Sequence, residues 1–402
     1  MTHKTPEHDT PRILAACTAA MPFFIKTLGD LVGIDSATEN IEGLNRKKDY
    51  LVAALQAVGA EVAVMDAAGP RSGTANIKGS LKGSGQAKIL LICHYDTVWS
   101  AGEAAKRPFR IENDVAYGPG VADAQHSLAG MVAVLKIVSA LQEKSFGELA
   151  VLMTADEEDG SIGSKELIMQ EAARHDVVFS MEGGGADGDE IIISVRGNNR
   201  AVLTVKGRAA HSGENPEYGR NAGEELAHQM LQMRDLGNRE KYTDINWTLG
   251  SFGSKYNMIP DSATATVNIR TALASEVDRV EKAMRERIAN VLIPGCEVSL
   301  AFTRMRPAFE YTEKTEKLAT AATAVFAELG RKLKLAHMGG ASDANFACQC
   351  APVLEGMGMG GGNWHALAEF LPLKTVPDRL YLLVRMVQEL STGKVLPLGK
   401  RG

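Results

Sequence analysis

Hydrophobic and polar positions follow two different periods in the first half of the chain. Continuous apolar runs at residues 87–93, 148–155 and 176–181 are typical of strands that are covered on both faces. Residues 47–58 and 127–141 instead have apolar positions at the spacing of a helix. Strands that alternate with helices in this way predict an α/β fold with a mostly parallel sheet.

The pattern changes near residue 194 and changes back near residue 308. Between these points the strands are expected at residues 199–206, 243–253, 262–270 and 296–303, and the helices at residues 221–236 and 275–291. We therefore expect two domains. One is discontinuous and consists of residues 1–196 and 308–402, and a smaller α+β domain at residues 197–307 interrupts it.

Composition and charge narrow the class of protein. The chain has 402 residues and a formal net charge of −5. This charge argues against a nucleic acid or an anionic membrane as partner, because both usually need a basic face. No run of about 18 apolar residues occurs, so no membrane-spanning helix is expected. The five cysteines are few and odd in number, which favours a reducing compartment over a disulfide framework.

The amino-terminal region leaves two interpretations open. Residues 13–24 are apolar and follow Arg12, as in the core of a signal peptide. Pro22 and the continuation through residues 25–32 favour a first amphipathic helix instead. We therefore expect a cytoplasmic protein, with export as the alternative.

Candidate chemical groups follow the ends of the predicted buried strands, where open α/β sheets bind their ligands. They are His94 and Asp96, Asp123 in a glycine-rich turn, Glu157 and Glu158, Glu182, and His365 after a glycine-rich loop. Each has an ordinary structural explanation; acidic residues at a helix start, for example, interact with the helix dipole. As a set, two imidazoles and several carboxylates predict a site for zinc, cobalt or manganese rather than calcium or magnesium, since imidazole favours those metals.

Four motifs are jointly specific for one family. They are His94-Tyr95-Asp96-Thr97-Val98, Tyr117-Gly118-Pro119-Gly120-Val121-Ala122-Asp123, Asp156-Glu157-Glu158-x-Gly160-Ser161-x-Gly163-Ser164 and Gly339-Gly340-Ala341-Ser342-Asp343. With them the chain resembles the two-zinc carboxypeptidase and aminoacylase superfamily, from about residue 24 to residue 390. This superfamily includes acetylornithine deacetylase, succinyl-diaminopimelate desuccinylase and the bacterial folate-cleaving glutamate carboxypeptidase, and the similarity to the last is the strongest.

The resemblance implies a centre of two divalent metal ions, with zinc as the first expectation and manganese or cobalt as alternatives. Asp123 would bridge the two ions. His94 and Glu182 would complete one site, and Glu158 and His365 the other. Water shared by two divalent cations loses a proton near neutral pH, which makes it a nucleophile for hydrolysis.

The resemblance also implies roles around the metals. Glu157 would be the general base, and Asp96 would hydrogen-bond His94 and fix its tautomer. The discontinuous domain would bind the metals, and the inserted domain would be a lid and dimerisation domain. The inserted domain would supply His211, Asn257 and Arg270 as substrate contacts, with His211 also stabilising the oxyanion.

The chain departs from the family pattern beside the expected ligands. Ala124-Gln125-His126-Ser127 follows Asp123, where relatives usually carry a Lys-Gly-Gly run. Gly183-Gly184 replaces the common Pro-Thr, and Ala366-Leu367-Ala368 replaces a segment that often has serine and an acidic residue. The expected ligands are kept while their surroundings differ, so the substrate and the metal identity stay open.

Three functions remain after these observations. The first is a carboxypeptidase that cleaves an amide C–N bond next to a free carboxylate, which Arg270 would hold. The second is a metal-dependent aminohydrolase or deacylase that acts on a non-peptide amine or N-acyl substrate, including an aromatic one. The third is a dimeric binding protein without catalysis. We further expect a homodimer through about residues 200–240, in which His211 acts in the partner's active site.

Overall fold

The computed structural model describes residues 10–67 and 69–398 of the chain. These residues form two compact units. The first unit comprises the described residues up to Ile193, Tyr311–His337, and the described residues from Ser342 onward, and the second comprises Ser194–Glu310 and Met338–Ala341. The domain bounds expected from the sequence, residues 1–196 with 308–402 and residues 197–307, stay a prediction. The short segment Met338–Ala341 groups with the second unit.

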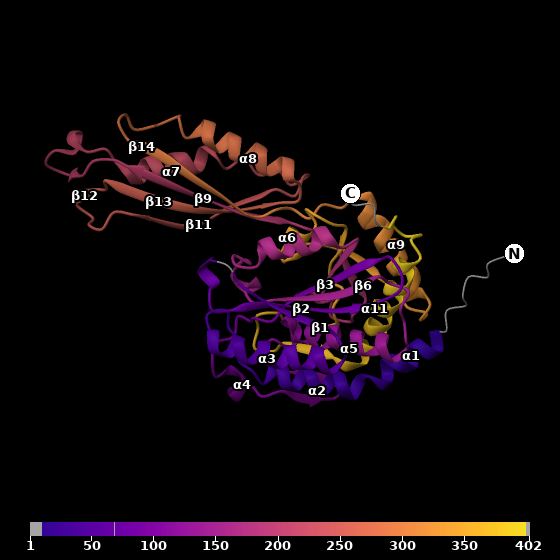
Figure 1. Ribbon diagram of the computed structural model, residues 1–402. Helices are drawn as coiled ribbons and strands as arrows, with labels where there is room; N and C mark the ends of the chain where they lie inside the picture. Colours follow the sequence, from indigo (N-terminus) through magenta and orange to yellow (C-terminus); the bar gives the residue numbers. More distant parts are fainter. Residues whose placement is uncertain (1–9, 68, 399–402) are drawn as a thin grey trace. The chain divides into compact units, whose positions relative to one another are not determined.

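A six-stranded sheet lies at the centre of the first unit (Figure 1). Its order is β1 (Glu61–Asp66), β2 (Ala75–Lys82), β6 (Glu148–Thr154), β3 (Lys88–His94), β7 (Val177–Ser180) and β16 (Val353–Leu354). The last four strands of this order are parallel, and β1 and β2 pair antiparallel at one side. The expected α/β fold with a mostly parallel sheet is therefore confirmed.

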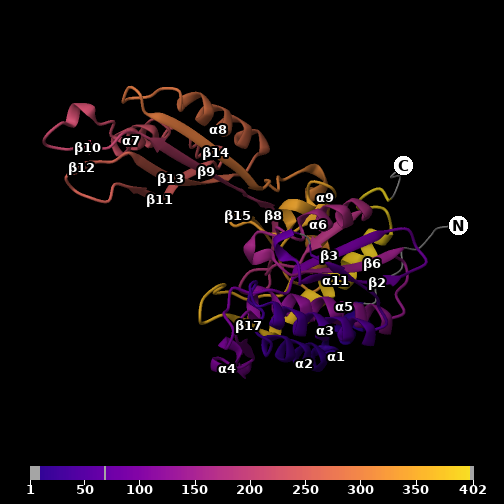
Figure 2. The ribbon, with the colours of Figure 1, turned by 60° about the vertical axis from the view of Figure 1, so that its left-hand side comes forward.

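Helices cover both faces of this sheet, and α6 lies on the face opposite to α3 and α5 (Figures 1 and 2). The longer helices are α1 (Thr10–Ala19), α2 (Met21–Val32), α3 (Ile41–Ala57), α5 (His126–Ala140), α6 (Lys165–Arg174), α9 (Glu313–Ala327) and α11 (Val376–Ser391). Helix α5 packs against β3, α2 and α11, and nearly all its residues are buried. Burial on both faces explains the continuous apolar runs of β3 and β6.

One described stretch, Val121–Ala140, is long and apolar enough to cross a membrane, whereas the sequence analysis expected none. Of its most apolar window, 89% is buried inside the first unit, as in the core helix of a folded domain. The consecutive helices α1 and α2 pass the same test only as a bent pair. Buried side chains of α2, including Phe24 and Leu28, pack in the core, in line with an amphipathic first region.

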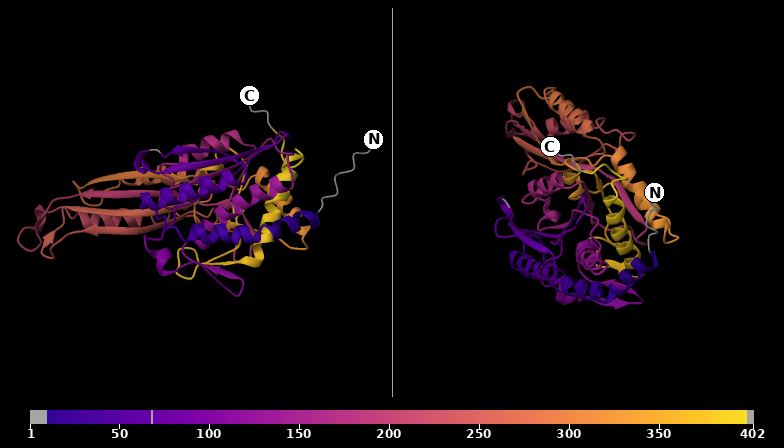
Figure 3. Two further views of the ribbon diagram at one scale, coloured as in Figure 1. Left: turned by 60° about the horizontal axis from the view of Figure 1, so that its bottom comes forward. Right: turned by 45° about the vertical axis from the view of Figure 1, so that its right-hand side comes forward.

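The second unit contains a four-stranded antiparallel sheet with two helices on one face (Figures 1 and 3). The strands, in spatial order, are β11 (Asp244–Phe252), β13 (Ser262–Thr271), β9 (Gly197–Lys206) and β14 (Glu297–Arg306), and the helices are α7 (Ala222–Gln232) and α8 (Ala274–Arg287). Buried and less buried residues alternate along β9 and β13, so one face of the sheet meets the helices. Strand β11 lies at an edge of this sheet.

Candidate active site

Two imidazoles of the first unit face one carboxylate. His94 Nε2 lies 3.2 Å from Asp123 Oδ1, and His365 Nε2 lies 3.0 Å from Asp123 Oδ2. Each oxygen of Asp123 therefore belongs to a different group of donor atoms. This arrangement makes Asp123 the common member of two adjacent sites.

One further carboxylate completes each group. Glu182 Oε1 lies 3.7 Å from His94 Nε2, and Glu158 Oε2 lies 3.3 Å from His365 Nε2. Donor atoms of His94, Asp123 and Glu158 all lie within 4.8 Å of one another. The structure thus brings together all five residues that the sequence suggested as metal ligands.

The parallel strands explain why these residues meet. His94 is the last residue of β3 and pairs in register with Thr154, the last residue of β6. Glu158 follows β6 in a short 3₁₀ turn, and Glu182 follows β7, the other neighbour of β3. Because the carboxyl ends of parallel strands meet at one edge, these side chains converge there.

Asp123 comes from a turn that precedes α5 rather than from a strand. The turn, Val121–Gln125, begins after Gly120, whose φ of 72° is in the left-handed region. A Cβ at this position would lie 2.8 Å from the Thr97 side chain and 3.1 Å from the backbone oxygen of Asp123. Glycine is therefore required at this position for steric as well as conformational reasons.

Asp96 is fully buried and connects the His94 ring to the loop after β6. Its carboxylate oxygens accept hydrogen bonds from the backbone N–H groups of Glu157 and Glu158, each at 3.1 Å, and from the Thr38 hydroxyl at 2.8 Å. His94 Nδ1 lies 3.2 Å from Asp96 Oδ1 and 3.1 Å from its backbone oxygen. Both neighbours are acceptors, so a neutral His94 ring carries its proton on Nδ1 and turns the lone pair of Nε2 toward Asp123.

Two other buried aspartates fold the same loop, and the sequence analysis gave them no role. Asp343 accepts hydrogen bonds from Thr154, at 2.8 Å, and from the Ser161 hydroxyl. Asp156 accepts one from the backbone N–H of Gly163 at 2.6 Å. These bonds explain why aspartates stand in both motifs, since buried carboxylates need such donors. Only the motifs themselves pointed to them.

The electrostatics of the cluster favour positive charge at its centre. Hydrogen bonds with Asp123 and Glu158 raise the pKa of His365 to about 10. Burial opposes protonation of His94, yet hydrogen bonds with Asp123 and Asp96 raise its pKa well above the usual value. Burial, together with the charges of Asp123 and Glu157, raises the pKa of Glu182 well above its usual value. Such a cluster attracts a cation.

The donor set fits a pair of divalent cations. Each group combines one imidazole with carboxylate oxygens, the ligand types that zinc, cobalt and manganese accept. Glu158 Oε1 is buried and has no hydrogen-bond partner among the described residues. A buried carboxylate oxygen without a donor is costly unless a cation takes that place.

Apolar side chains and a buried histidine lie next to the ligand candidates in the chain. Trp364 is 41% exposed and Leu367 is 73% exposed, on either side of His365 in the chain. A Cβ on Gly183 would lie 3.3 Å from the Trp364 ring, so the indole lies against the residue that follows Glu182. His126, in the segment that departs from the family pattern after Asp123, is buried, and its Nδ1 lies 2.7 Å from the Ser127 hydroxyl.

Glu369 joins two segments near the cluster. Its carboxylate accepts hydrogen bonds from the backbone N–H of Gly120, at 2.5 Å, and from Trp99 Nε1, at 3.0 Å. Burial and the nearby charge of Asp123 raise the pKa of Glu369 to about 7. Glu369 therefore fixes the turn that carries Asp123 by a hydrogen bond. The sequence alone did not predict this contact.

In the second unit, His211 and Asn257 lie together. His211 belongs to β10 (Ala210–His211), which pairs with β12 (Met258–Ile259), and Ser212 N donates to Asn257 O at 3.1 Å. The backbone N–H groups of Gly213 and Glu214 both donate to His211 Nδ1, each at 3.1 Å. The proton of the neutral ring is therefore on Nε2, which leaves an exposed N–H donor.

Arg270 lies in β13 of the four-stranded sheet, at the end away from the loop with His211. Strand β13 pairs with β9 from Ser262, opposite Lys206, to Arg270, opposite Asn198. The loop with His211 follows Lys206, so about eight residues of strand, roughly 26 Å, separate the two ends. Arg270 Nε donates to Asn268 Oδ1 at 3.1 Å. Its pKa is lowered by burial and then by the like charges of Arg306 and Arg196. Arg196 is in turn paired with Asp244, which lies opposite Arg270 on β11.

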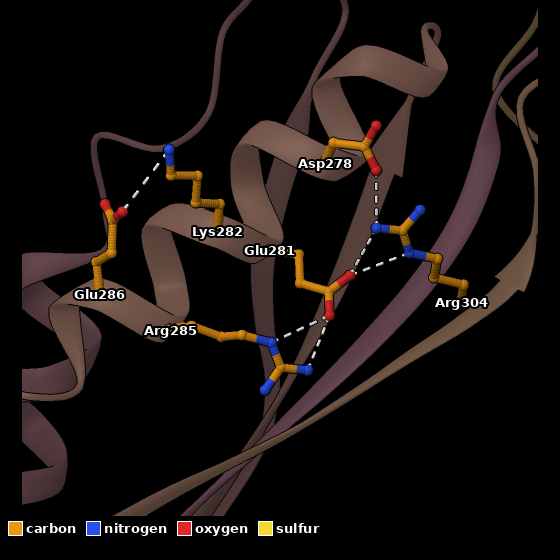
Figure 4. Close-up of a pocket in the computed structure, with 6 residues that line it drawn as sticks. All are labelled: Asp278, Glu281, Lys282, Arg285, Glu286 and Arg304. Atoms are coloured by element: carbon orange, nitrogen blue, oxygen red, sulfur yellow. Dashed lines mark hydrogen bonds and ion pairs between the residues drawn. The ribbon is translucent and has the colours of Figure 1, made fainter.

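A surface cavity of about 430 Å³ on α8 and β14 is lined by ion pairs and contains no imidazole (Figure 4). Its side chains are oppositely charged and paired with each other: Asp278, Glu281, Lys282, Arg285, Glu286 and Arg304. Glu281, for example, lies 2.8 Å from Arg285 and from Arg304. The charges neutralise one another, and the cavity contains none of the predicted site residues.

Comparisons with known proteins agree with this geometry. A family model described as peptidase family M20/M25/M40 matches residues 90–389. Carboxypeptidase G2 of Pseudomonas sp. (strain RS-16) is 35% identical over 385 residues, which cover 95% of this chain and 92% of the relative. Succinyl-diaminopimelate desuccinylase of Dechloromonas aromatica is 29% identical over 70% of this chain and 77% of its own length.

Solved structures share the fold. A tripeptidase from Staphylococcus aureus superposes with a TM-score of 0.80 at 22% identity and covers 92% of this chain and 99% of its own. A dinuclear metal-binding peptidase from Bacillus subtilis gives 0.70 at 14% identity, over 93% and 99% of the two chains. The resemblance seen in the four motifs is confirmed. The chain belongs to peptidase family M20/M25/M40 and is a metal-dependent hydrolase.

Proposed function

We propose that the protein is a carboxypeptidase-like hydrolase that cleaves an amide C–N bond next to a free carboxylate, with two divalent cations at the cluster around Asp123. The observation that carries this proposal is the position of the Asp123 carboxylate, with one oxygen toward His94 and the other toward His365. The 35% identity to carboxypeptidase G2 over nearly the whole chain supports the reaction class. Zinc is the first candidate for the metal.

The side chains divide the chemistry among themselves. The cations, when bound, polarise the amide carbonyl and make water more acidic. Glu157 stands beside the ligand Glu158, and its backbone is fixed by Asp96. We assign to Glu157 the role of general base, which takes the proton of the attacking water and passes it to the leaving nitrogen. Its neighbour Glu158 serves as a ligand, so the two adjacent glutamates have different tasks.

Two groups of the second unit complete the proposal. His211, with its proton on Nε2, is an exposed donor suited to the oxyanion that forms on the amide carbonyl. Arg270 is suited to the carboxylate of the substrate, which its planar guanidinium can bind with two hydrogen bonds. Asn257 lies beside His211 and would contact the same substrate.

The separation of His211 from Arg270 supports a homodimer. A small substrate cannot span the two ends of β13, so one second unit cannot serve a single active site with both groups. A second copy resolves this, if one subunit supplies Arg270 and the partner subunit supplies its own His211 and Asn257. Strand β11 offers an edge for pairing, with exposed Leu249 and Phe252. We infer a dimer through the second unit.

A second candidate function rests on Trp364. Its exposed indole beside His365 and against Gly183 could stack on a flat substrate group. This favours an aminohydrolase or deacylase that acts on an aromatic amine or N-acyl compound, without need of a carboxylate.

The location we propose is cytoplasmic, which the five free cysteines support.

A substrate screen separates these functions. The protein is stripped with a chelator, reloaded with zinc, manganese or cobalt, and offered three matched series. These are N-acyl amino acids, the same compounds with the carboxylate amidated, and N-acyl aryl amines. Hydrolysis restricted to the first series supports the carboxypeptidase. Equal hydrolysis of amidated compounds, or turnover of aryl amides alone, contradicts it and supports the second function.

A further inference from the structure

Lys47 is a lysine on the apolar face of a helix. It lies in α3 beside the buried residues Leu44 and Leu51, and it is only 1% exposed. Its Nζ donates hydrogen bonds to Ser36 Oγ at 2.7 Å and to Gln125 Oε1 at 2.9 Å. Both acceptors are uncharged, although a buried lysine is usually paired with a carboxylate. Burial lowers the pKa of Lys47 to about 7, against the attraction of Asp96 and Asp35.

The two hydrogen bonds lead to two segments that carry metal-ligand candidates. Ser36 Oγ donates to the backbone oxygen of Tyr95 at 2.9 Å, and Tyr95 stands between His94 and Asp96. Gln125 is in the turn Val121–Gln125, two residues after Asp123. The Lys47 ammonium group therefore connects the end of β3 to the turn before α5. It does so through hydrogen bonds to Ser36 and Gln125, which are neighbours of the metal-ligand candidates rather than candidates themselves.

We propose that Lys47 is a positioning residue for the metal centre, which fixes the segment of His94 and the turn of Asp123 relative to each other. The inference rests on the proposed function in so far as these residues bind metal.

Gln125 is a position from which a second lysine could replace the Lys47 ammonium. It is one of the positions where the turn departs from the family pattern, and its side-chain oxygen accepts a hydrogen bond from Lys47 Nζ. A lysine at position 125 could therefore place its own ammonium close to the point that Lys47 Nζ occupies. On this proposal the ammonium is needed at this place, and either α3 or the turn after Asp123 can supply it.

The test measures zinc affinity of the full-length protein by competition with a chromophoric chelator, without use of a substrate. Lys47→Met keeps a long apolar side chain and removes the ammonium. We expect zinc binding to weaken by roughly 10- to 100-fold, the usual cost of losing a group that orients metal ligands. The double variant Lys47→Met/Gln125→Lys should recover most of the affinity.

The matched control is Lys78→Met. Lys78 is a largely buried lysine of β2 whose partners are Glu171, at 2.7 Å, and Glu148, at 3.5 Å. This variant should lower the melting temperature and leave zinc affinity unchanged. If Lys47→Met does no more than the control, Lys47 has only a structural role and the proposal is overturned. Loss of affinity that Gln125→Lys fails to restore contradicts the relocated ammonium.

Ser36→Ala tests the same link if Lys47→Met does not fold. This variant keeps the lysine and removes the hydrogen bond to Tyr95. A several-fold loss of zinc affinity then supports the proposal, and unchanged affinity overturns it. If the wild-type protein itself binds no zinc, manganese or cobalt, the proposed function fails and this inference fails with it. A wild type that binds metal beside an equally competent Lys47→Met overturns this inference alone.

Discussion

The groups proposed for metal binding and those proposed for substrate binding are arranged in opposite ways. In the first unit, side chains from separate segments converge on Asp123, and their donor atoms lie within a few ångströms. In the second unit, His211 in β10 lies beyond one end of β13, and Arg270 lies near the other end of that strand. The groups proposed for metal binding are therefore complete within one unit, whereas those proposed for substrate binding are not brought together in a single second unit.

The two arrangements also differ in support. Three of the ligand candidates, His94, Glu158 and Glu182, lie at or just after the ends of buried parallel strands. Asp96 and Asp343 fix the loop after β6 with hydrogen bonds. His211 lies in an exposed loop, where two backbone N–H groups fix the tautomer. Metal binding should therefore survive changes in the second unit, and substrate turnover should not.

The largest effect is expected from Glu157→Gln. The amide cannot accept the proton of water, so turnover should fall by roughly 10²- to 10⁴-fold. Zinc content should stay at the wild-type level, because Glu157 is not a proposed ligand. The matched variant Glu158→Gln should instead lose zinc affinity. Near-normal turnover by Glu157→Gln would show that the base is another residue.

His211→Ala should lower turnover by roughly 10²- to 10³-fold, the usual cost of one oxyanion donor, with zinc binding intact. Mixing this variant with Glu157→Ala, followed by dissociation and reassembly, tests the dimer. If His211 acts in the partner's active site, one site of each mixed dimer contains both groups and activity returns. No recovery on reassembly would place His211 in the active site of its own chain.

Arg270→Ala should weaken kcat/KM for substrates with a free carboxylate. A hydrogen-bonded charge contributes about 1.5–3 kcal/mol, so the expected loss is roughly 10- to 100-fold. Amidated substrates should be almost unaffected, which makes them the control for folding. Equal losses in the two substrate series would argue against carboxylate recognition by Arg270.

A smaller effect concerns the stability of the metal-free protein. The pKa of His365 is raised to about 10 by Asp123 and Glu158, so the folded state binds this proton more tightly than the unfolded state. The stabilisation is fully present below the unfolded pKa of about 6.5 and is lost as the pH rises through about 10. His365→Asn should therefore lower the melting temperature at pH 6 and have less effect at pH 10.

The same protonation should compete with zinc, which binds neutral imidazole. Zinc affinity of the wild type should rise with pH over this range. Thermal unfolding with and without zinc, at a series of pH values, measures both effects. A difference between wild type and His365→Asn that does not change with pH would contradict the assigned cause.

The elements with strong periodicity could be predicted from the sequence. Strands β3 and β6 and helix α5 lie close to their expected positions, because burial on all sides leaves a continuous apolar pattern. Strand β2 was missed, since Lys78, Gly79 and Ser80 interrupt its apolar residues. Lys78 is accommodated in the structure by ion pairs with Glu148 and Glu171, which no local pattern indicates.

The candidate site divides in the same way. The ligand candidates stand in motifs, so their types and positions were visible in the sequence. The supporting contacts join residues that are distant in the chain: Lys47 with Gln125, and Thr154 with Asp343. The spacing of α3 did place Lys47 at an apolar position beside Leu44 and Leu51, and that was the one local signal of its burial.

The most direct test of the central claim is anomalous diffraction at the zinc absorption edge from crystals of the zinc-loaded protein. We expect two peaks on either side of the Asp123 carboxylate, one beside His94 and Glu182 and the other beside Glu158 and His365. The Asp123→Ala variant, treated identically, should lose at least one peak. Zinc elsewhere in the molecule, or two peaks that persist without the Asp123 carboxylate, would contradict a metal centre built around this residue.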